Sequence, residues 1–315
     1  MTAAFAYSGT ELVGLAAAET ANPRKSLPSA VKQVFWRITM FYVVSLLLVG
    51  LLVPYTDHRL IVPTGNSRST RASPFVISIQ NAGIQGLPSV MNVVILISVI
   101  SVGNSAIYGA SRTMAALSEQ GQAPPFLSYI DRRGRPIFSI LTASAFGLLA
   151  YLGASPDQQA AFNWMIALCG LSCIFTWGSI CLAHIRFRRA WEIQGHDLSE
   201  LAFRSQAGII GSWVGFVFNV LVLIAQFWVA FAPVGYETQS ANDLVIGFFQ
   251  AYLAFPIVII CYISYKLAYK TKIMRTRDMD LHSGKRNMDV TFLLAQEKAE
   301  RESWPRWKKV YKYFC

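Results

Sequence analysis

The stretch FAYSGTELVG, residues 5–14, contains Glu11, the only charged residue between Met1 and Ala18. The Ser-Gly-Thr triplet directly before this carboxylate consists of poor helix formers. In hydrocarbon every backbone N–H and C=O group must be satisfied, so a helix is interrupted only where its backbone faces protein or a wet cavity. If the surrounding chain is a membrane protein, the stretch therefore indicates a transmembrane helix that is broken at Gly9.

The composition is that of a membrane protein. Hydrophobic residues make up 54% of the 315 residues and charged residues 14%, and the mean hydropathy is +0.40. Such values are rare in soluble domains, and runs of about 20 apolar residues are long enough to cross a bilayer. We expect transmembrane helices at residues 1–19, 34–53, 90–116, 137–155, 162–184, 209–233 and 244–266. The chain would then consist of a transmembrane domain, residues 1–268, and a cytoplasmic tail, residues 269–315.

Three shorter segments complete the expected organisation. NPRKSLPSAVKQ, residues 22–33, holds two prolines and is expected to form a cytoplasmic turn. PFVISIQNAGIQGLPS, which begins at Pro74, is too short to cross and predicts an interfacial or re-entrant helix, with a plain loop as the alternative. Thr291–Glu302 in the tail is an amphipathic helix candidate.

Basic residues lie mainly on alternate loops. They gather in DRRGRP (131–136), in HIRFRRAW (184–191) and in the tail, whereas the loops around Asp157 and Glu237 contain no Lys or Arg. The positive-inside rule then predicts an N-terminus outside and a C-terminus in the cytoplasm. The net charge of +11 thus reflects the topology and requires no nucleic acid partner. The basic residues of the tail would also be attracted to anionic membrane lipid.

The first residues lack the basic region of a signal peptide.

Catalytic, metal and cofactor signals are also lacking in the sequence. No CxxC pair occurs among the five cysteines, so neither a metal site nor a cofactor is expected. The four histidines are far apart in sequence and none pairs with a nucleophile, so an enzyme is not expected.

Glu11 has two readings. At the bilayer centre a carboxylate costs a few kcal/mol unless it is neutral or paired. Unwinding at Gly9 would free backbone groups and expose two half-helix ends, which together suit a zwitterion or its coupling ion, and a neutral carboxyl group suits a proton carrier. In the alternative reading, Glu11 only forms a structural hydrogen bond to a neighbouring helix.

The sequence resembles the fungal amino acid permeases of the amino acid–polyamine–organocation superfamily. The resemblance lies in FAYSGTELVGLAAAETANPRKSLPSAVKQVFWRI, LISVISVGNSAIYGASRTMAALSEQGQAP, FNWMIALCGLSCIFTWGSICLAHIRFRRAW and the tail. It implies an all-α integral membrane fold of seven transmembrane helices, equivalent to helices 6–12 of a twelve-helix inverted-repeat (LeuT-like) transporter, with the first helix broken. It also implies proton-coupled amino acid uptake, a symport, at the plasma membrane.

The resemblance also implies a set of site residues. The unwound segment, whose backbone would meet the substrate, consists of Ala6, Tyr7, Ser8, Gly9 and Thr10, followed by Glu11 as the carboxylate that binds or couples. Asn104 and Ser105 match the polar point of the family's eighth helix, where related transporters place a coupling cation. Phe175 and Trp177 match the tenth helix, which closes over the outer side of the site, although aromatic residues in a bundle are more often core.

The chain departs from the family in starting at the sixth helix. Helices one to five are absent, including the other broken helix, so we expect a fragment that is inactive alone. The explanations are a gene model that begins at an internal Met, a true truncation that leaves a non-functional permease, and a missing half supplied by another chain.

The tail carries candidate modification sites. Cys315, which follows Tyr313 and Phe314, is a candidate for S-acylation, with an unmodified thiol as the alternative. The accessible lysines would make trafficking or ubiquitination machinery a partner of the tail, and they are Lys272, Lys285, Lys298, Lys308, Lys309 and Lys312.

A seven-helix receptor is the alternative from another functional class. Such receptors of the G-protein-coupled type have an acidic-Arg-aromatic motif at the inner end of the third span, where this chain has Ser111, Arg112 and Thr113. The last span, Leu244–Tyr265, also lacks an Asn-Pro break. The sequence therefore favours a transporter.

Overall fold

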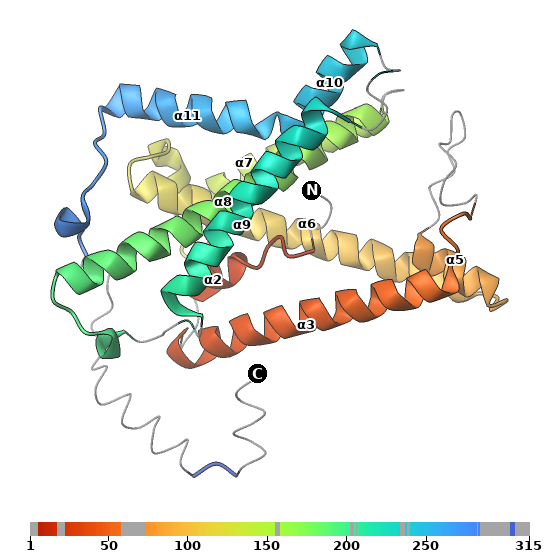
Figure 1. Ribbon diagram of the computed structural model, residues 1–315, viewed down its shortest axis with the longest axis horizontal. Helices are drawn as coiled ribbons and strands as arrows, with labels where there is room; N and C mark the ends of the chain where they lie inside the picture. The colour runs from red at the N-terminus through yellow and green to blue at the C-terminus, as the bar shows by residue number, and fades with distance from the viewer. Residues whose placement is uncertain are drawn as a thin grey trace. The chain divides into compact units, whose positions relative to one another are not determined.

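The computed structural model describes residues 6–17, 23–57, 73–154, 158–201, 205, 207–233, 237, 240–281, 283 and 303–305. Within these residues the regular structure is helical and no strand occurs. The α-helices are α2 (Leu12–Ala17), α3 (Pro23–Leu52), α5 (Pro74–Asn81), α6 (Leu87–Glu119), α7 (Ile137–Gly147), α8 (Gln158–Ile193), α9 (Gly208–Phe231), α10 (Ala241–Tyr252) and α11 (Ala254–Tyr269) (Figure 1). The 3₁₀ helices are η1 (Pro125–Ser128), η2 (Leu148–Ala154), η3 (Leu198–Glu200) and η5 (Thr276–Asp278).

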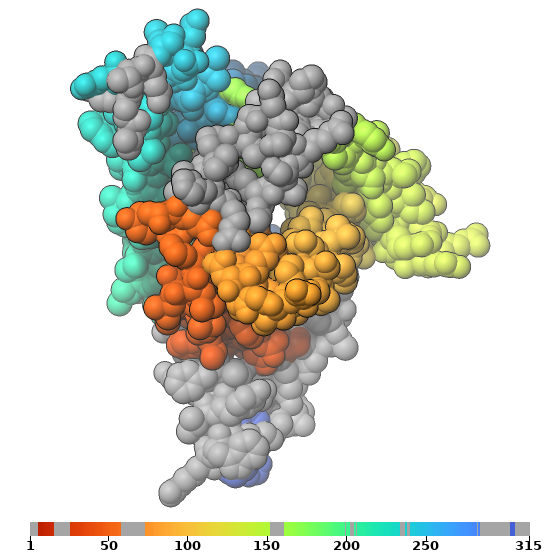
Figure 2. All heavy atoms as spheres, turned by 90° about the vertical axis from the view of Figure 1, so that its right-hand side faces the viewer, coloured from red at the N-terminus to blue at the C-terminus, as the bar shows by residue number. Residues whose placement is uncertain are grey.

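The chain divides into two compact units. Unit 1 contains the start of the chain up to Ser8 and Ala150–Tyr313, and unit 2 is built on Gly9–Leu149. In unit 2, α6 contacts α2, α5, α7 and η1. The short helix α5 also contacts α3, so it lies between the end of α3 and the start of α6 (Figures 1 and 2).

Unit 1 is organised around α8. Helix α9 packs along α8, α10 contacts both of them, and α11 contacts α8 (Figure 1). Leu171 and Ile174 of α8 form a buried cluster with Tyr252 and Ala254, the residues on either side of the junction between α10 and α11. Burying such side chains contributes about 1.5–3 kcal/mol each for the larger ones, so this cluster joins the three helices.

Four described helices are long and apolar enough to cross a membrane: Ser26–Leu52, Leu87–Glu119, Ala161–Ile193 and Gly208–Phe231. The most apolar stretches of the first two contain no buried residue. Large apolar side chains such as Leu51 and Val102 are 75% and 69% exposed. Exposure of apolar surface on this scale would be unstable in water, which is the expected condition of helices that face lipid. These four helices coincide with predicted spans.

The last predicted span, residues 244–266, is not a single straight helix. Helices α10 and α11 meet at Leu253 with a bend of 58°, and the pair makes a fifth span if it is counted as one broken helix. Pro256 has no N–H group, so the carbonyl oxygen of Tyr252 loses its usual helical partner four residues ahead. Proline in the first turn of α11 is therefore the local cause of the bend.

Two further sequence predictions need correction. The turn predicted for residues 22–33 is wrong, because α3 begins at Pro23 and passes through Pro28. Proline is well suited to the first position of a helix, where its missing N–H would have no helical partner. The predicted helix at 137–155 is α-helical only to Gly147 and continues as the 3₁₀ helix η2, so the apolar helix Ile137–Tyr151 is shorter than a full span.

The short segment after Ser73 forms α5, so the plain-loop alternative is wrong there, while its place at the membrane interface stays a prediction. Of the first predicted span, residues 6–17 are described. The tail helix candidate 291–302, Cys315 and most of the tail lysines lie outside the described residues, and Lys272 is exposed.

Candidate functional site

The predicted break in the first span is centred on Gly9. Residues 6–11 form consecutive turns, and the helix α2 begins only at Leu12. Gly9 has a φ of +91°, in the left-handed region where a side chain would be strained. The non-helical backbone thus covers all six residues that the resemblance assigns to the substrate site: Ala6, Tyr7, Ser8, Gly9, Thr10 and Glu11.

The carbonyl groups of this segment accept hydrogen bonds from the start of α2. The N–H of Leu12 donates to the oxygen of Gly9 at 3.1 Å, and the N–H of Gly14 donates to the oxygen of Glu11 at 3.0 Å. Both bonds span three residues, as in a 3₁₀ turn. The segment is therefore a defined tight turn that leads into α2.

Glu11 takes part in this turn through its side chain. Its Oε1 atom accepts a hydrogen bond from the backbone N–H of Gly9 at 3.3 Å, and the residue is half-buried. The carboxylate thus satisfies a donor of the unwound backbone, which gives Glu11 a structural role. Its role in substrate binding or proton coupling stays a prediction.

Ser8, in unit 1, lies beside α8. Its Oγ atom is 3.3 Å from Sγ of Cys173. The sequence prediction did not single out Cys173, although a signal exists: Cys169, Cys173 and Trp177 follow one another at intervals of four and share one face of α8. Cys169 is exposed and Cys173 is half-buried.

The two aromatic residues predicted on α8 differ in their surroundings. The ring of Phe175 lies 6.0 Å from that of Phe255 at an interplanar angle of 35°, and it packs against the buried cluster of unit 1. This contact favours the core reading of Phe175. Trp177 is half-buried, two positions further along α8.

Asn104 and Ser105 lie on α6 in unit 2, and both are exposed. The hydroxyl group of Ser105 donates to the carbonyl oxygen of Ser101 at 3.0 Å, so this donor is used within its own helix. One turn further along, α6 meets the first residue of α2, because a Cβ atom on Gly109 would lie 2.4 Å from Cδ2 of Leu12. The sequence prediction missed this contact.

The sequence does contain a signal for the contact between α6 and Leu12, a stripe of small residues on α6. Ser101, Ser105 and Gly109 follow one another at intervals of four. Small residues at this spacing let membrane helices approach closely. Gly109 is the residue of this stripe that contacts α2, whereas Ser101 and Ser105, on the same face of α6, are exposed.

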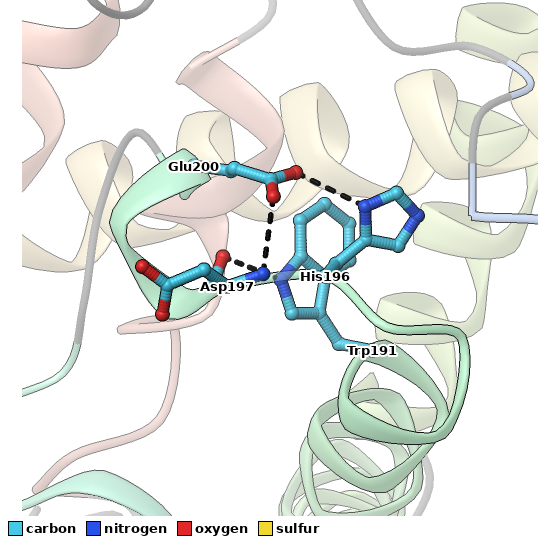
Figure 3. Close-up of polar contacts among 4 residues, drawn as sticks. All are labelled: Trp191, His196, Asp197 and Glu200. Atoms are coloured by element: carbon cyan, nitrogen blue, oxygen red, sulfur yellow. Dashed lines mark hydrogen bonds and ion pairs between the residues drawn. The ribbon is translucent and has the colours of Figure 1, made fainter.

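A second polar cluster closes the loop after α8, in unit 1 (Figure 3). Glu200 accepts hydrogen bonds from the N–H of Asp197 and from Nδ1 of His196, both at 3.0 Å. Trp191 is almost fully buried and its Nε1 donates to the carbonyl oxygen of Asp197 at 2.9 Å. The cluster anchors the loop. Among the described residues, no group of three or more His, Cys, Asp or Glu side chains is arranged to hold a metal ion.

Long apolar helices with lipid-type surfaces define a multi-pass integral membrane protein, and an unwound polar segment precedes the short helix α2 at the start of the described chain. Residues 1–277 match the amino acid permease family, and the chain belongs to that family. The resemblance to fungal amino acid permeases is thus confirmed.

Three relatives illustrate the similarity of the chain to fungal amino acid permeases. The general amino-acid permease GAP1 of Saccharomyces cerevisiae is 52% identical over 321 residues, which cover all of this chain and 52% of the relative. The general amino-acid permease GAP2 of Candida albicans is 53% identical over 320 residues, covering all of this chain and 53% of the relative. The histidine permease of S. cerevisiae is 47% identical over 305 residues, covering 96% of this chain and 50% of the relative. The chain spans about half the length of these relatives, and no solved structure matches it.

Proposed function

We propose that the chain takes part in amino acid uptake across the plasma membrane, driven by co-transport of protons. The observation that carries the proposal is the turn centred on Gly9, with its positive φ and with Glu11 folded back onto it, in a member of the amino acid permease family. The relatives are named as general amino acid or histidine permeases, which supports an amino acid cargo without indicating a single one.

In this proposal the turn supplies the backbone groups that recognise the substrate. A zwitterion needs hydrogen-bond acceptors for its ammonium group, and unwound carbonyl groups can provide them. Within unit 1, Cys173 lies beside Ser8 at the edge of the segment. Asn104 and Ser105, which the family resemblance assigns to transport, are exposed polar residues of α6 in unit 2. Trp177 is the remaining candidate for closing the site, since Phe175 packs into the core.

Glu11 has two tasks in the proposal. The ionised carboxylate accepts the hydrogen bond from Gly9 and holds the turn. Moving the segment within the bilayer costs less free energy when this side chain carries no net charge. Proton binding would then be coupled to movement of the segment through the hydrogen bond between Gly9 and Glu11.

The two readings of Glu11 are separated by two substitutions. Glu11→Gln retains an oxygen that accepts the bond from Gly9 but cannot carry a proton, whereas Glu11→Ala loses both properties. The matched control is Glu119→Gln, which removes an exposed carboxylate at the end of α6.

Uptake of labelled amino acids is measured in yeast cells that lack their own general permeases. The chain is expressed alone and joined to the segment of GAP1 that precedes the matching region. We expect uptake by the joined protein that falls on addition of a protonophore, and no uptake by the chain alone. Glu11→Gln should abolish accumulation but retain exchange of labelled for unlabelled amino acid, Glu11→Ala should abolish both, and Glu119→Gln should behave as the unmodified protein.

Wild-type accumulation by Glu11→Gln, with loss only in Glu11→Ala, would show that Glu11 is purely structural. A joined protein that reaches the plasma membrane and takes up no amino acid would overturn the proposed function. Uptake by the chain alone would show that it is active without the preceding segment.

A further inference from the structure

The loop that connects α6 to α7, residues 120–136, ends at the edge of the membrane. Helix α6 has no charged residue from Leu87 to Ser111, a length of about 37 Å at ~1.5 Å per residue, which is enough to cross a hydrocarbon core of ~30 Å. Arg112 is the first charge after this stretch, so its guanidinium group belongs at the level of the lipid headgroups.

Arg112 fixes the depth of the connecting loop. Its Nη1 atom donates to the carbonyl oxygen of Gly134 at 3.2 Å. The turn Asp131–Arg135 therefore lies at the same level as Arg112. Two residues after this turn, the apolar helix α7 begins at Ile137. The end of the loop thus lies at the membrane edge, whereas its start follows Glu119, about 10 Å further along α6 at ~1.5 Å per residue.

The turn is ordered and displays arginine side chains. The N–H of Asp131 donates to the oxygen of Arg135 at 2.9 Å, and the side chains of these two residues form an ion pair at 3.0 Å. Arg132 and Arg133 are exposed, and in the described part of the chain neither guanidinium group has a hydrogen bond or ion pair. Two cationic side chains are therefore presented on a fixed backbone.

An aromatic cluster adjoins this turn. Phe126, Tyr129 and Phe138 are 55%, 53% and 44% exposed. The ring of Phe138 lies 6.3 Å from that of Phe126 and 5.5 Å from that of Tyr129, in edge-to-face contacts. Exposed aromatic rings beside cationic side chains are typical of the membrane–water interface, where the rings lie among the headgroups.

Two buried hydroxyl groups hold the loop in place. Ser139 of α7 is fully buried and donates to the carbonyl oxygen of Leu127 at 2.8 Å. Ser118 of α6 donates to the oxygen of Pro124 at 2.7 Å. The loop is thus attached to both helices, so a ligand would meet groups that are already ordered.

We propose that this loop binds the headgroups of anionic phospholipids, with Arg132 and Arg133 contacting the phosphate groups and the rings of Phe126, Tyr129 and Phe138 lying in the interface. Arginine forms paired hydrogen bonds with phosphate oxygens, and each basic residue near an anionic surface contributes about 1 kcal/mol. The positive-inside pattern places the loop on the cytoplasmic leaflet. This inference is independent of the transported substrate.

The test compares lipid binding by two variants of equal charge. The full chain is purified in detergent, phosphatidylserine or phosphatidylcholine is added, and bound lipid is counted by native mass spectrometry. The variant R132Q/R133Q removes the two proposed contacts. The matched control K270Q/K272Q removes two exposed lysines after α11. We expect the unmodified chain to retain more phosphatidylserine than phosphatidylcholine. R132Q/R133Q should lose this preference with a several-fold fall in bound phosphatidylserine. K270Q/K272Q, which loses the same charge from the tail, should keep the preference with a much smaller fall.

Equal retention of phosphatidylserine by R132Q/R133Q and the unmodified chain would overturn the proposal. Displacement of the lipid by millimolar inorganic phosphate would also overturn it, because the loop would then be a general phosphate site. A second measurement requires no variant: hydrogen exchange of the unmodified chain in nanodiscs should be slower at residues 125–135 when phosphatidylserine is present. Unchanged exchange there would contradict the proposal.

Discussion

The side chain of Leu12, the first residue of α2, occupies the space beside Gly109 of α6. A Cβ atom on Gly109 would lie 2.4 Å from Cδ2 of Leu12, well inside the contact distance of two carbon atoms. Gly109 itself is buried. The start of α2, directly after the unwound segment, is therefore positioned by the lack of a side chain on α6.

Enlarging Gly109 should destabilise unit 2 in proportion to the volume added. Gly109→Ala should change stability little, since the rotamer change forced on Leu12, about 0.5–1.5 kcal/mol, is offset by about 1 kcal/mol from replacing glycine inside a helix. Gly109→Leu should lower the melting temperature by several degrees, and adding Leu12→Ala should restore part of the loss. Thermal unfolding of each variant in detergent measures its melting temperature.

The control for that series is Gly103, which has open space around it. Gly103→Leu should not lower the melting temperature. Equal losses for Gly103→Leu and Gly109→Leu would show that the contact with Leu12 has no energetic weight.

Substrate should protect Cys173 from thiol reagents. Its sulfur lies 3.3 Å from Oγ of Ser8, so an amino acid bound along the unwound segment would restrict access to it. In the joined transporter we expect a saturating amino acid to slow alkylation of Cys173 several-fold and to leave the exposed Cys169, one turn away, unaffected. Mass spectrometry of the alkylated peptides separates the two sites. Equal protection at both, or at neither, would argue against Ser8 as part of the substrate site.

Replacing Pro256 should reduce the bend between α10 and α11. Pro256→Ala supplies an N–H group for the carbonyl oxygen of Tyr252, which favours a continuous helix. Spin labels at the exposed positions Val245 and Ile263, in a background without native cysteines, should move apart. An unchanged distance would show that packing of Tyr252 and Ala254 against α8 maintains the 58° bend without the proline.

The turn Asp131–Arg135 should weaken in acid. The side-chain hydrogen bond from Arg135, followed by the backbone N–H of Arg132, holds the pKa of Asp131 below its usual value of 3.8. Because the folded-state pKa is the lower one, the stabilisation is complete above the unfolded-state pKa and disappears as the pH falls through the folded-state pKa. The melting temperatures of the unmodified chain and of Asp131→Asn should therefore differ at pH 6 and converge toward pH 3. A difference that is independent of pH would contradict this assignment.

Several elements of the structure were predicted from short segments of the sequence. The spans near residues 34–53, 90–116, 162–184 and 209–233 were predicted because their apolar runs have the length of a bilayer crossing. The unwinding at Gly9 was predicted because a glycine between two hydroxyl residues, followed by a carboxylate, disfavours a helix. The helix from Pro23 was missed because proline was read only as a breaker, although it also starts helices.

The sequence by itself determined the class of protein, the position of most membrane helices and the place where the first one is broken, because hydropathy, helix length and glycine conformation are properties of short segments. Only the tertiary structure decided that Leu12 lies against Gly109, that Ser8 lies against Cys173 and that Arg112 holds the carbonyl of Gly134. Each of these contacts joins segments that are distant along the chain. Such contacts depend on how whole helices pack, which no local pattern of residues specifies.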